Sequence, residues 1–356
     1  MDISIAPFLL HFKFDAGTSR GILKTRKSWV IKLENDGMTG LGEVAPLKGL
    51  SPEGYENFQN TLISELNIFR EMGTISFESC KHLFSSSTLF GLESALLSLH
   101  QTQEGQVLDN SFFEGKSQLP INGLIWMGDS SFMKKQIDEK INEGYSCLKM
   151  KIGSLDFEEE YKLLTELRNE FSVEQLTLRV DANGSFTFSE AIKAIRKLEE
   201  LEIHSIEQPI KAGQLREMTQ LCRETSTIGV ALDEELIGIR DTNDKIEILD
   251  KIHPQYIVLK PTLHGGISGT KEWISLAEER KIKWWITSAL ESNIGLNAIC
   301  QLTNEYNIET PQGLGTGSLY TNNILSPLEV LGEKIQYNPL NKWDYSVLNF
   351  NKILRC

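Results

Sequence analysis

The runs SCLKMKI at residues 146–152 and QLTLRVD at 175–181 decide the fold. Each is short and mostly apolar and has a charged residue at or near its end, and a helical stretch separates the two. That stretch carries Leu163, Leu164 and Leu167 on one helical face. Six more runs of the same kind flank them along the chain: LPINGLI (119–125), IHSIEQP (203–209), TIGVALDE (227–234), QYIVLKP (255–261), IKWWITS (282–288) and ETPQGLG (309–315). Eight strand candidates separated by helices predict a parallel sheet of βα units, most simply a closed (β/α) barrel.

The residues before the barrel predict a different kind of unit. SWVIKLE (28–34) and MTGLGEV (38–44) are joined by Asn35-Asp36-Gly37, a sequence typical of a β-hairpin turn. Residues 52–104 follow with helical patterning. We therefore expect an α+β unit ahead of the barrel.

Composition excludes several classes of function. Of the 356 residues, 36 are Lys or Arg and 49 are Asp or Glu, and the net charge of −13 is unlike that of a nucleic-acid or anionic-membrane binder. No apolar run approaches the roughly 18–20 residues that cross a bilayer. The first residues, MDISIAPFLLHFKF, lack the basic segment of a signal peptide. The five cysteines are scattered, which argues against disulfides and a Cys-based zinc site. We expect a cytoplasmic protein.

Five charged residues mark the ends of five consecutive apolar runs, and we call them the charged ring: Lys151, Asp181, Glu207, Asp233 and Lys260. Neighbours in this series are 26 to 30 residues apart, about one βα unit. In a barrel, successive strand ends surround one mouth, where such barrels place their chemistry. Because a buried charge is costly unless it binds an ion or another charge, we expect these residues to form a site.

The three acids of the charged ring predict a site for a metal ion. Asp181, Glu207 and Asp233 would supply carboxylate oxygens from three neighbouring strands, without Cys or His. Oxygen ligands of this kind suit Mg²⁺, which leaves positions for water and a substrate oxygen. The alternative is that three unrelated acids pair with Lys or Arg, but their common register favours the metal site.

The lysines predict acid–base chemistry. Lys149 and Lys151 lie two residues apart on one strand and therefore face the same way. Two ammonium groups near a divalent cation disfavour protonation, so we expect one of these lysines to be neutral near pH 7 and to act as a base. Lys260 would face them from the opposite side of the ring. The alternative, an exposed edge strand, is disfavoured by the apolar residues around the pair.

This constellation resembles the enolase superfamily, a group known to combine a Lys or His base with Mg²⁺. The matching strings cover the whole barrel in order: LKMKIG (148–153), RVDANG (179–184), IEQP (206–209), LDEE (232–235) and LKP (259–261). They look like the muconate-lactonizing subgroup, whose fold is a modified (β/α)8 TIM-type barrel, (β/α)7β, with an α+β capping domain. GEVAPLKGLSPE (42–53) resembles a loop of that capping domain.

The resemblance also implies where the domains divide. It places the capping domain at residues 1–115, completed by 325–356, and the catalytic barrel at 116–324.

Two further strings narrow the activity. SALESNIGL (288–296) and GLGTG (313–317) resemble o-succinylbenzoate synthases of menaquinone biosynthesis. The implied reaction is a Mg²⁺-dependent syn-dehydration of 2-succinyl-6-hydroxy-2,4-cyclohexadiene-1-carboxylate through an ene-diolate, which would make the protein a lyase. N-Succinylamino acid racemisation and dipeptide epimerisation stay open, although the Asp-x-Asp element usual in dipeptide epimerases is absent here. A non-catalytic ligand-binding barrel is the remaining alternative.

The same resemblance implies roles for the charged ring. Lys151 would remove the α-proton and then protonate the departing hydroxide on the same face. Lys260 would stay cationic and stabilise the ene-diolate. Asp181, Glu207 and Asp233 would hold Mg²⁺, for which Mn²⁺ can substitute. The partner is then a small-molecule carboxylate, and the sequence leaves open whether the chain forms a homo-oligomer.

Other residues are expected around the ring. Lys149 would tune Lys151, Asn183 would orient groups near the metal, and Glu234 would partner a lysine. The groups expected to hold the succinyl carboxylate are Ser288 and the backbone N–H groups of Gly313 and Leu314.

Residues 17–27 (GTSRGILKTRK) predict a mobile lid whose four basic residues attract a dianion. The alternative for this segment is a solvated surface loop. Arg179 shares a strand face with Asp181, and we expect it to form a structural ion pair.

Overall fold

The structure is a computed structural model that describes residues 1–18, 21–153, 156–225 and 227–353. Seven parallel strands form its central sheet, in which sequence order and spatial order agree. They are β5 (Gly123–Ile125), β6 (Cys147–Lys151), β7 (Thr177–Asp181), β8 (Ser205–Glu207), β9 (Gly229–Leu232), β10 (Tyr256–Leu259) and β11 (Lys283–Ile286). Each strand is short and mostly buried, as expected for a parallel sheet covered by helices.

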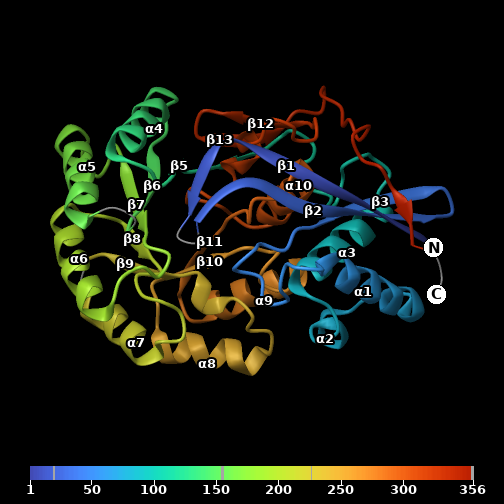
Figure 1. Cartoon of the computed structure of the whole chain (residues 1–356), viewed down its shortest axis with the longest axis horizontal. Coiled ribbons are helices and arrows are strands. Elements are labelled where there is room, and N and C mark those ends of the chain that lie inside the picture. Colours follow the sequence, from blue (N-terminus) through green and yellow to red (C-terminus); the bar gives the residue numbers. More distant parts are fainter. Residues whose placement is uncertain (19–20, 154–155, 226, 354–356) are drawn as a thin grey trace.

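Helices follow the strands and cover the outside of the sheet (Figure 1). They are α4 (Ser130–Asn142), α5 (Phe157–Glu170), α6 (Phe188–Glu200), α7 (Leu215–Glu224), α8 (Thr242–Ile252), α9 (Gly266–Glu279) and α10 (Asn293–Thr303). Helix α6 illustrates why they begin where they do, because Thr187 and Glu190 form a capping box at its first turn. The alternation of strands and helices predicted from the sequence is confirmed.

Residues 312–313 close the barrel. Gln312 bridges Ile121 beside the first barrel strand, and Gly313 bridges Thr287 just beyond β11, both in parallel orientation. A short 3₁₀ turn, η2 (Gly315–Leu319), follows instead of an eighth helix. The result is the expected (β/α)7β arrangement with an α+β capping unit.

Two predicted strands differ in the structure. The segment 119–125 divides into β4 (Gln118–Pro120), which pairs antiparallel with β13 (Lys334–Tyr337), and β5, which joins the barrel. Between them the Ile121 N–H donates to Glu333 O and the Asn122 N–H donates to Gln312 O, so the chain changes partners there. The segment 309–315 forms isolated β-bridges rather than a strand, because only Gln312 and Gly313 pair with neighbouring segments of the barrel.

The capping unit is a four-stranded antiparallel sheet in the order β14-β1-β2-β3. Its strands are β1 (Asp2–Thr18), β2 (Gly21–Asn35), β3 (Met38–Val44) and β14 (Asn351–Lys352), and the two chain ends therefore meet in one sheet (Figure 1). The predicted hairpin is confirmed: Asn35 pairs with Met38, and Asp36 and Gly37 both have positive φ, as a type I′ turn requires.

The helical stretch predicted at 52–104 becomes α1 (Phe58–Met72), α2 (Phe77–Cys80) and α3 (Ser86–Leu99). Helix α3 lies so close to β3 that a Cβ on Gly42 would stand 1.9 Å from Gly91 O, and one on Gly40 would stand 2.0 Å from Ala95 O. Only glycine permits this approach of helix and strand.

Two buried carboxylates join the capping unit to the barrel. Glu93 of α3 accepts the N–H groups of Ile267 and Ser268 at the start of α9. Glu43 of β3 accepts those of Ser292 and Gly295 at the start of α10. Both carboxylates therefore satisfy helix N-termini, where negative charge is favoured.

The C-terminal residues contact both units. Strands β12 (Leu328–Leu331) and β13 form a hairpin that extends β4, whereas β14 pairs with β1. The division into residues 1–115 with 325–356 and residues 116–324 stays a prediction. Among the described residues, the four cysteines Cys80, Cys147, Cys222 and Cys300 are buried and free. Among the described residues, no helix combines the length and apolarity needed to cross a membrane.

Candidate active site

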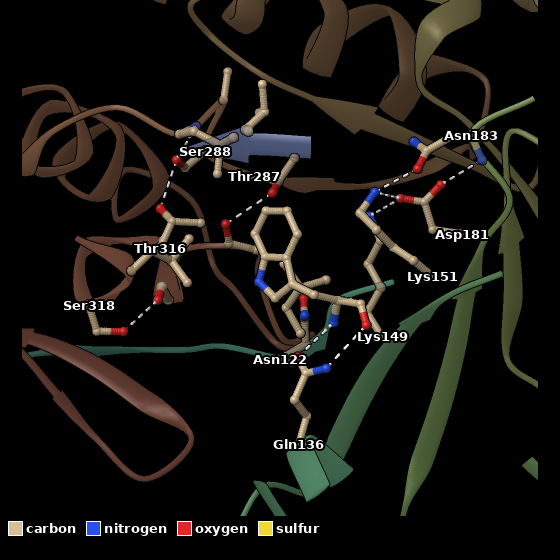
Figure 2. Close-up of a pocket in the computed structure, with 18 of the residues that line it drawn as sticks. Asn122, Gln136, Lys149, Lys151, Asp181, Asn183, Thr287, Ser288, Thr316 and Ser318 are labelled. Atoms are coloured by element: carbon tan, nitrogen blue, oxygen red, sulfur yellow. Dashed lines mark hydrogen bonds and ion pairs between the residues drawn. The ribbon is translucent and has the colours of Figure 1, made fainter. Parts of the chain in front are cut away.

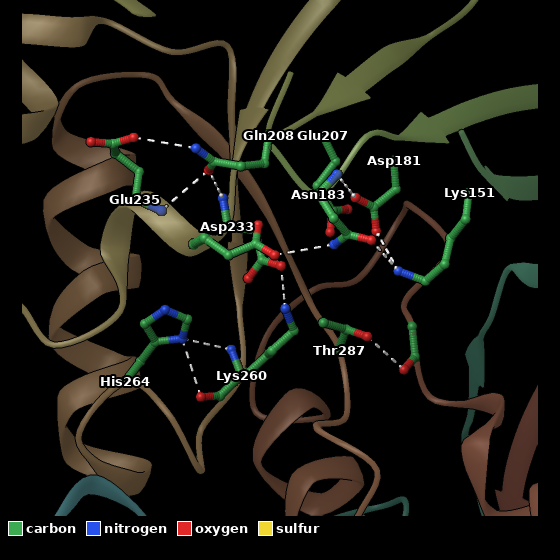
Figure 3. A network of polar contacts seen from close by, with 12 residues as sticks. Lys151, Asp181, Asn183, Glu207, Gln208, Asp233, Glu235, Lys260, His264 and Thr287 are labelled. Atoms are coloured by element: carbon green, nitrogen blue, oxygen red, sulfur yellow. Dashed lines mark hydrogen bonds and ion pairs between the residues drawn. The ribbon is translucent and has the colours of Figure 1, made fainter. Parts of the chain in front are cut away.

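The charged ring lies at one end of the barrel. Lys151, Asp181 and Glu207 end β6, β7 and β8 and are direct neighbours in the parallel register, while Asp233 and Lys260 directly follow β9 and β10. All five side chains line one cavity of about 1240 Å³. The structure thus brings together groups that are far apart in the chain (Figure 3).

Ion pairs link the acids of the ring to lysines. Asp181 Oδ2 lies 3.0 Å from Lys149 Nζ and 3.1 Å from Lys151 Nζ. Lys149 Nζ also lies 2.6 Å from Glu207 Oε2, and Lys260 pairs with Asp233. Lys149 and Lys151 are therefore linked with Asp181 and Glu207, and Lys260 and Asp233 form a separate ion pair that lines the same cavity.

The pKa values of the acids diverge because their neighbours differ. Burial raises the pKa of Glu207 to about 8, and the negative charge of Asp181 adds to the shift. Burial acts in the same direction on Asp181, but Lys149 and Lys151 outweigh it and hold the pKa of Asp181 below its usual value. Lys260 likewise lowers the pKa of Asp233 against the effect of burial. Divergent pKa values of this kind are typical of functional sites.

Of the two lysines on β6, Lys149 is the one that the acids of the ring hold in its charged form. Burial does favour its neutral form, but Asp181 and Glu207 outweigh burial and raise the pKa of Lys149 above its ordinary value. The two carboxylates lie closer to Lys149 than the sequence spacing alone could show. Lys149 is therefore a counter-ion that joins two acids of the ring.

The carboxylates offer the donor chemistry of a metal site. Glu207 Oε1 and Asp233 Oδ1 are buried and have no hydrogen-bond partner. An unsatisfied buried acceptor is costly, by roughly 1–3 kcal/mol and more for a charged group, so a cation would be stabilising here. Oxygen donors alone fit Mg²⁺. In the part of the chain that the structure describes, however, no three Asp, Glu, His or Cys side chains are gathered as a preformed metal site, and the lysine ammonium groups neutralise the carboxylates instead.

Asn183 lies where the sequence predicted an orienting residue. Its Oδ1 accepts from Lys151 Nζ at 2.6 Å, and its backbone N–H donates to Asp181 Oδ1 at 3.0 Å. Its Nδ2 donates to Glu234 Oε1 at 3.1 Å. A positive φ of 45° turns the residue back toward the ring. Glu234 therefore reaches Lys151 through Asn183. Burial lowers the pKa of Lys260, but the charges of Asp233 and then Glu234 outweigh burial and raise that pKa above its ordinary value.

The opposite wall of the cavity carries hydroxyl groups from the last two strand ends (Figure 2). Ser288 Oγ donates to Glu291 at 2.7 Å and accepts from the Leu290 N–H and from Thr316 Oγ1. Its hydrogen therefore points at a buried carboxylate and away from the cavity. Thr316 also lines the cavity, and the string GLGTG that contains it does not by itself show which of its groups faces a ligand.

Two backbone groups predicted to bind substrate are placed otherwise. The Gly313 N–H donates to Ile286 O at 2.9 Å as part of the barrel closure, so it is not available to a ligand. Leu314 is fully buried and does not line the cavity. A glycine-rich string suggested open N–H groups, but here its glycine lets the chain approach Thr287, since a Cβ on Gly313 would stand 2.1 Å from Thr287 Oγ1.

The predicted lid contributes apolar groups to the cavity. Gly21, Ile22 and Leu23 at the start of β2 line it, together with Lys13 and Phe14 of β1. Ile22 is 63% exposed, so an apolar side chain that lines the cavity also faces solvent.

The three described basic residues of that segment, Lys24, Arg26 and Lys27, do not line the cavity, contrary to expectation. Arg26 is buried and donates to the carbonyls of Ala45, Pro46 and Ala289. Lys24 lies near Asp15, and Lys27 stacks over a tryptophan ring. Arg20 lies outside the described residues.

Arg179 also differs from expectation. Its guanidinium lies 4.4 Å from the centre of the Trp285 ring and donates to Pro311 O at 2.8 Å, and no acidic partner is found for it among the described residues. The contact is a cation–π interaction rather than an ion pair.

Comparison with known proteins agrees with this geometry. Residues 133–322 match the family model described as Enolase C-terminal domain-like, and residues 13–99 match the model described as MenC, N-terminal domain. The chain belongs to the enolase superfamily. It is 42% identical to an o-succinylbenzoate synthase from Desulfotalea psychrophila, over 93% of this chain and 98% of that protein.

Solved structures of the superfamily show the same fold. MenC from Desulfotalea psychrophila LSv54 superposes with a TM-score of 0.80 at 38% identity, covering 94% of this chain and 99% of that one. The L-Ala-D/L-Glu epimerase from Bacillus subtilis, in a substrate-liganded complex, has a TM-score of 0.81 at 19% identity, covering 96% and 97%. The latter likeness concerns the fold alone.

Proposed function

We propose that this protein is an o-succinylbenzoate synthase of menaquinone biosynthesis, a lyase that dehydrates 2-succinyl-6-hydroxy-2,4-cyclohexadiene-1-carboxylate. One observation carries the proposal: a chain 42% identical to such an enzyme over nearly its whole length gathers all five residues of the charged ring in one cavity. The cavity, of about 1240 Å³, is large enough for a substrate of this size.

Lys151 is the base in this proposal. Its Nζ is held by Asn183 and Asp181 at the edge of the cavity. In its neutral form it accepts the proton from the ring carbon that bears the carboxylate, and the electron pair moves toward that carboxylate. The ammonium so formed returns the proton to the departing hydroxide on the same face, which releases water and leaves an aromatic ring.

Lys260 stabilises the negative charge in this proposal. It enters the cavity from β10, with three strands between it and the strand of Lys151. Asp233 pairs with it and helps to keep it cationic, against the effect of burial. An ammonium on this side favours the ene-diolate of the substrate.

Asp181, Glu207 and Asp233 would hold Mg²⁺, or Mn²⁺ in its place, and the ion would stabilise the charge that develops on the substrate carboxylate. Two facts support this set: the donor atoms are all carboxylate oxygens, and Glu207 Oε1 and Asp233 Oδ1 lack hydrogen-bond partners. The proposal includes a cytoplasmic location, a small-molecule carboxylate as the partner, and the domain division at residues 115 and 324.

A second candidate follows from the placement of the two lysines. Lys151 and Lys260 enter from different sides of the carboxylates, as an acid and a base must in a racemase or epimerase (Figure 3). N-Succinylamino acid racemisation is therefore the alternative activity. The segment at 313–316 offers no carboxylate for a substrate amine, which disfavours a dipeptide.

The direct test incubates the purified protein with the cyclohexadiene substrate and Mg²⁺ and follows the ultraviolet change of aromatisation. We expect turnover that depends on Mg²⁺ and is abolished in Lys151→Ala but retained in Lys134→Ala, whose lysine pairs with Glu166 on the outer helices. No turnover with or without metal would reject the synthase. Exchange of an α-deuterium in N-succinylamino acids that needs both Lys151 and Lys260 would support the racemase instead.

A further inference from the structure

Gln208 directly follows Glu207 and is fully buried (Figure 3). Its side-chain amide makes four hydrogen bonds. Oε1 accepts the N–H of Asp233 at 3.1 Å and the N–H of Glu235 at 3.2 Å. Nε2 donates to Ile210 O at 3.0 Å and to Glu235 Oε2 at 3.2 Å. An amide has two donor hydrogens and two acceptor sites, so its capacity is fully used.

The backbone of the same residue bonds to β9 and to the turn after β7. Its N–H donates to Ala231 O at 2.8 Å, and its carbonyl accepts the N–H of Gly184 at 2.6 Å. Gly184 lies in the turn after β7, and Ala231 lies in β9. The φ of Gln208 is 39°, in the left-handed region that non-glycine residues rarely adopt. Such a conformation persists where several surrounding contacts hold it.

We infer that Gln208 is a positioning residue that sets the distance between the carboxylates of Glu207 and Asp233 and so the affinity of the site for Mg²⁺. It cannot be a ligand itself, because each of its polar atoms is already used. Gln208 instead holds the backbone N–H of Asp233, and because Gln208 directly follows Glu207, it fixes the position of Asp233 relative to Glu207. This inference rests on the proposed metal set of the synthase.

The chemistry of the contacts requires an amide at this position. A carboxylate at 208 could accept the N–H groups of Asp233 and Glu235, but it would face the carbonyl of Ile210 and the carboxylate of Glu235 without a hydrogen to donate. Glu235 is itself fixed, since its Oε1 accepts the Gly213 N–H at 2.9 Å. Exchanging the two groups, with Glu at 208 and Gln at 235, would restore the bond between them.

The chain offers a matched control in Gln301 of α10. Gln301 is also fully buried, and its Oε1 accepts two backbone N–H groups, those of Val107 and Leu108, at 2.8 Å. Its Nε2 donates to Gly105 O and Asn297 Oδ1, both at 2.9 Å. It has the same bonding pattern as Gln208, but none of the hydrogen bonds given for its side chain reaches a proposed metal ligand.

The test measures Mg²⁺ binding by calorimetry, and stability by urea unfolding without metal, in Gln208→Met and Gln301→Met. We expect both variants to lose stability, and only Gln208→Met to raise the dissociation constant for Mg²⁺, by roughly 10- to 100-fold. A dissociation constant for Gln208→Met within twofold of wild type, or an equal rise in Gln301→Met, would overturn the inference.

A second pair of variants covers the case in which Gln208→Met does not fold. We expect Gln208→Glu to weaken Mg²⁺ binding and the double variant Gln208→Glu/Glu235→Gln to recover most of it, whereas no recovery would count against a positioning role. If wild-type protein itself bound no Mg²⁺, the proposed ligand set would be wrong and the inference would fall with it. Wild-type binding that Gln208→Met leaves unchanged would reject the inference alone.

Discussion

Replacing Lys149 by Met removes the positive charge that joins Asp181 and Glu207. The Lys149 ammonium lies 3.0 Å from Asp181 Oδ2 and 2.6 Å from Glu207 Oε2, and both acids are at most 2% exposed. Removing one partner of a buried ion pair typically costs about 3–5 kcal/mol, and the lower end of this range applies here because Asp181 keeps Lys151 as a partner. We therefore expect Lys149→Met to lower the free energy of unfolding of the metal-free protein by about this amount.

Mg²⁺ should reverse part of that loss, because it supplies the missing positive charge to the same carboxylates. At a concentration of 100 times its dissociation constant, a ligand that binds only the folded state stabilises by about 2.7 kcal/mol. Urea unfolding with and without Mg²⁺ measures both effects. The matched control is Lys245→Met: Lys245 is also fully buried and pairs with Glu272, but it does not line the cavity.

We expect Lys245→Met to lose stability in the absence of metal and to gain from Mg²⁺ no more than wild type does. A Lys149→Met protein that is as stable as wild type without metal would refute the argument that Lys149 neutralises the two acids. A Mg²⁺ effect smaller than that on wild type would show that the ion does not bind between these carboxylates.

Three further results are expected. Asn183→Ala should lower kcat by roughly 10- to 100-fold with little change in KM, because Lys151 loses the acceptor that orients it. Steady-state kinetics measure this, and an unchanged kcat would show that Asn183 does not orient Lys151. The folded-state pKa of Glu207, about 8, lies above its ordinary value of 4.5, so the stability of the metal-free protein should fall as the pH rises from about 4.5 to about 8. Urea unfolding at several pH values should show a weaker dependence of stability on pH in Glu207→Gln. An unaltered dependence would contradict the raised pKa of Glu207. Arg26→Met should destabilise the protein by about 2–5 kcal/mol, because three carbonyls lose their donor; a midpoint of thermal unfolding equal to that of wild type would argue that Arg26 does not hold Ala289.

The charged ring could be predicted because the interior of a parallel barrel is apolar. A charged residue at the end of a short apolar run, such as Asp181 after QLTLRV, stands out against that background. An acid recurs at Glu207 and at Asp233, each one βα unit further along the chain. This spacing indicates that the acids occupy equivalent positions at the ends of successive strands. Period and polarity are local properties of the chain, so they can be read without coordinates.

The partners of each polar group could not be predicted in the same way. Arg26 sits in a stretch rich in basic residues, but the carbonyl of Ala289, which it holds, is 263 residues away. The N–H of Gly313 is used by Ile286 across the barrel closure. Ser288 directs its hydrogen to Glu291 because burial leaves that carboxylate few other donors. Each of these outcomes depends on competition among groups that only folding brings into contact.

Side-chain type and spacing along the chain therefore specified the barrel, the hairpin at Asp36-Gly37 and the five groups of the ring, because these features follow from backbone geometry and the exclusion of charge from an apolar interior. The charge of Lys149, the direction of the Ser288 hydroxyl and the bracing amide of Gln208 followed from the folded arrangement instead. Hydrogen bonds and electrostatic forces act over a few ångströms through space, and two residues adjacent in space can lie hundreds of positions apart in the chain.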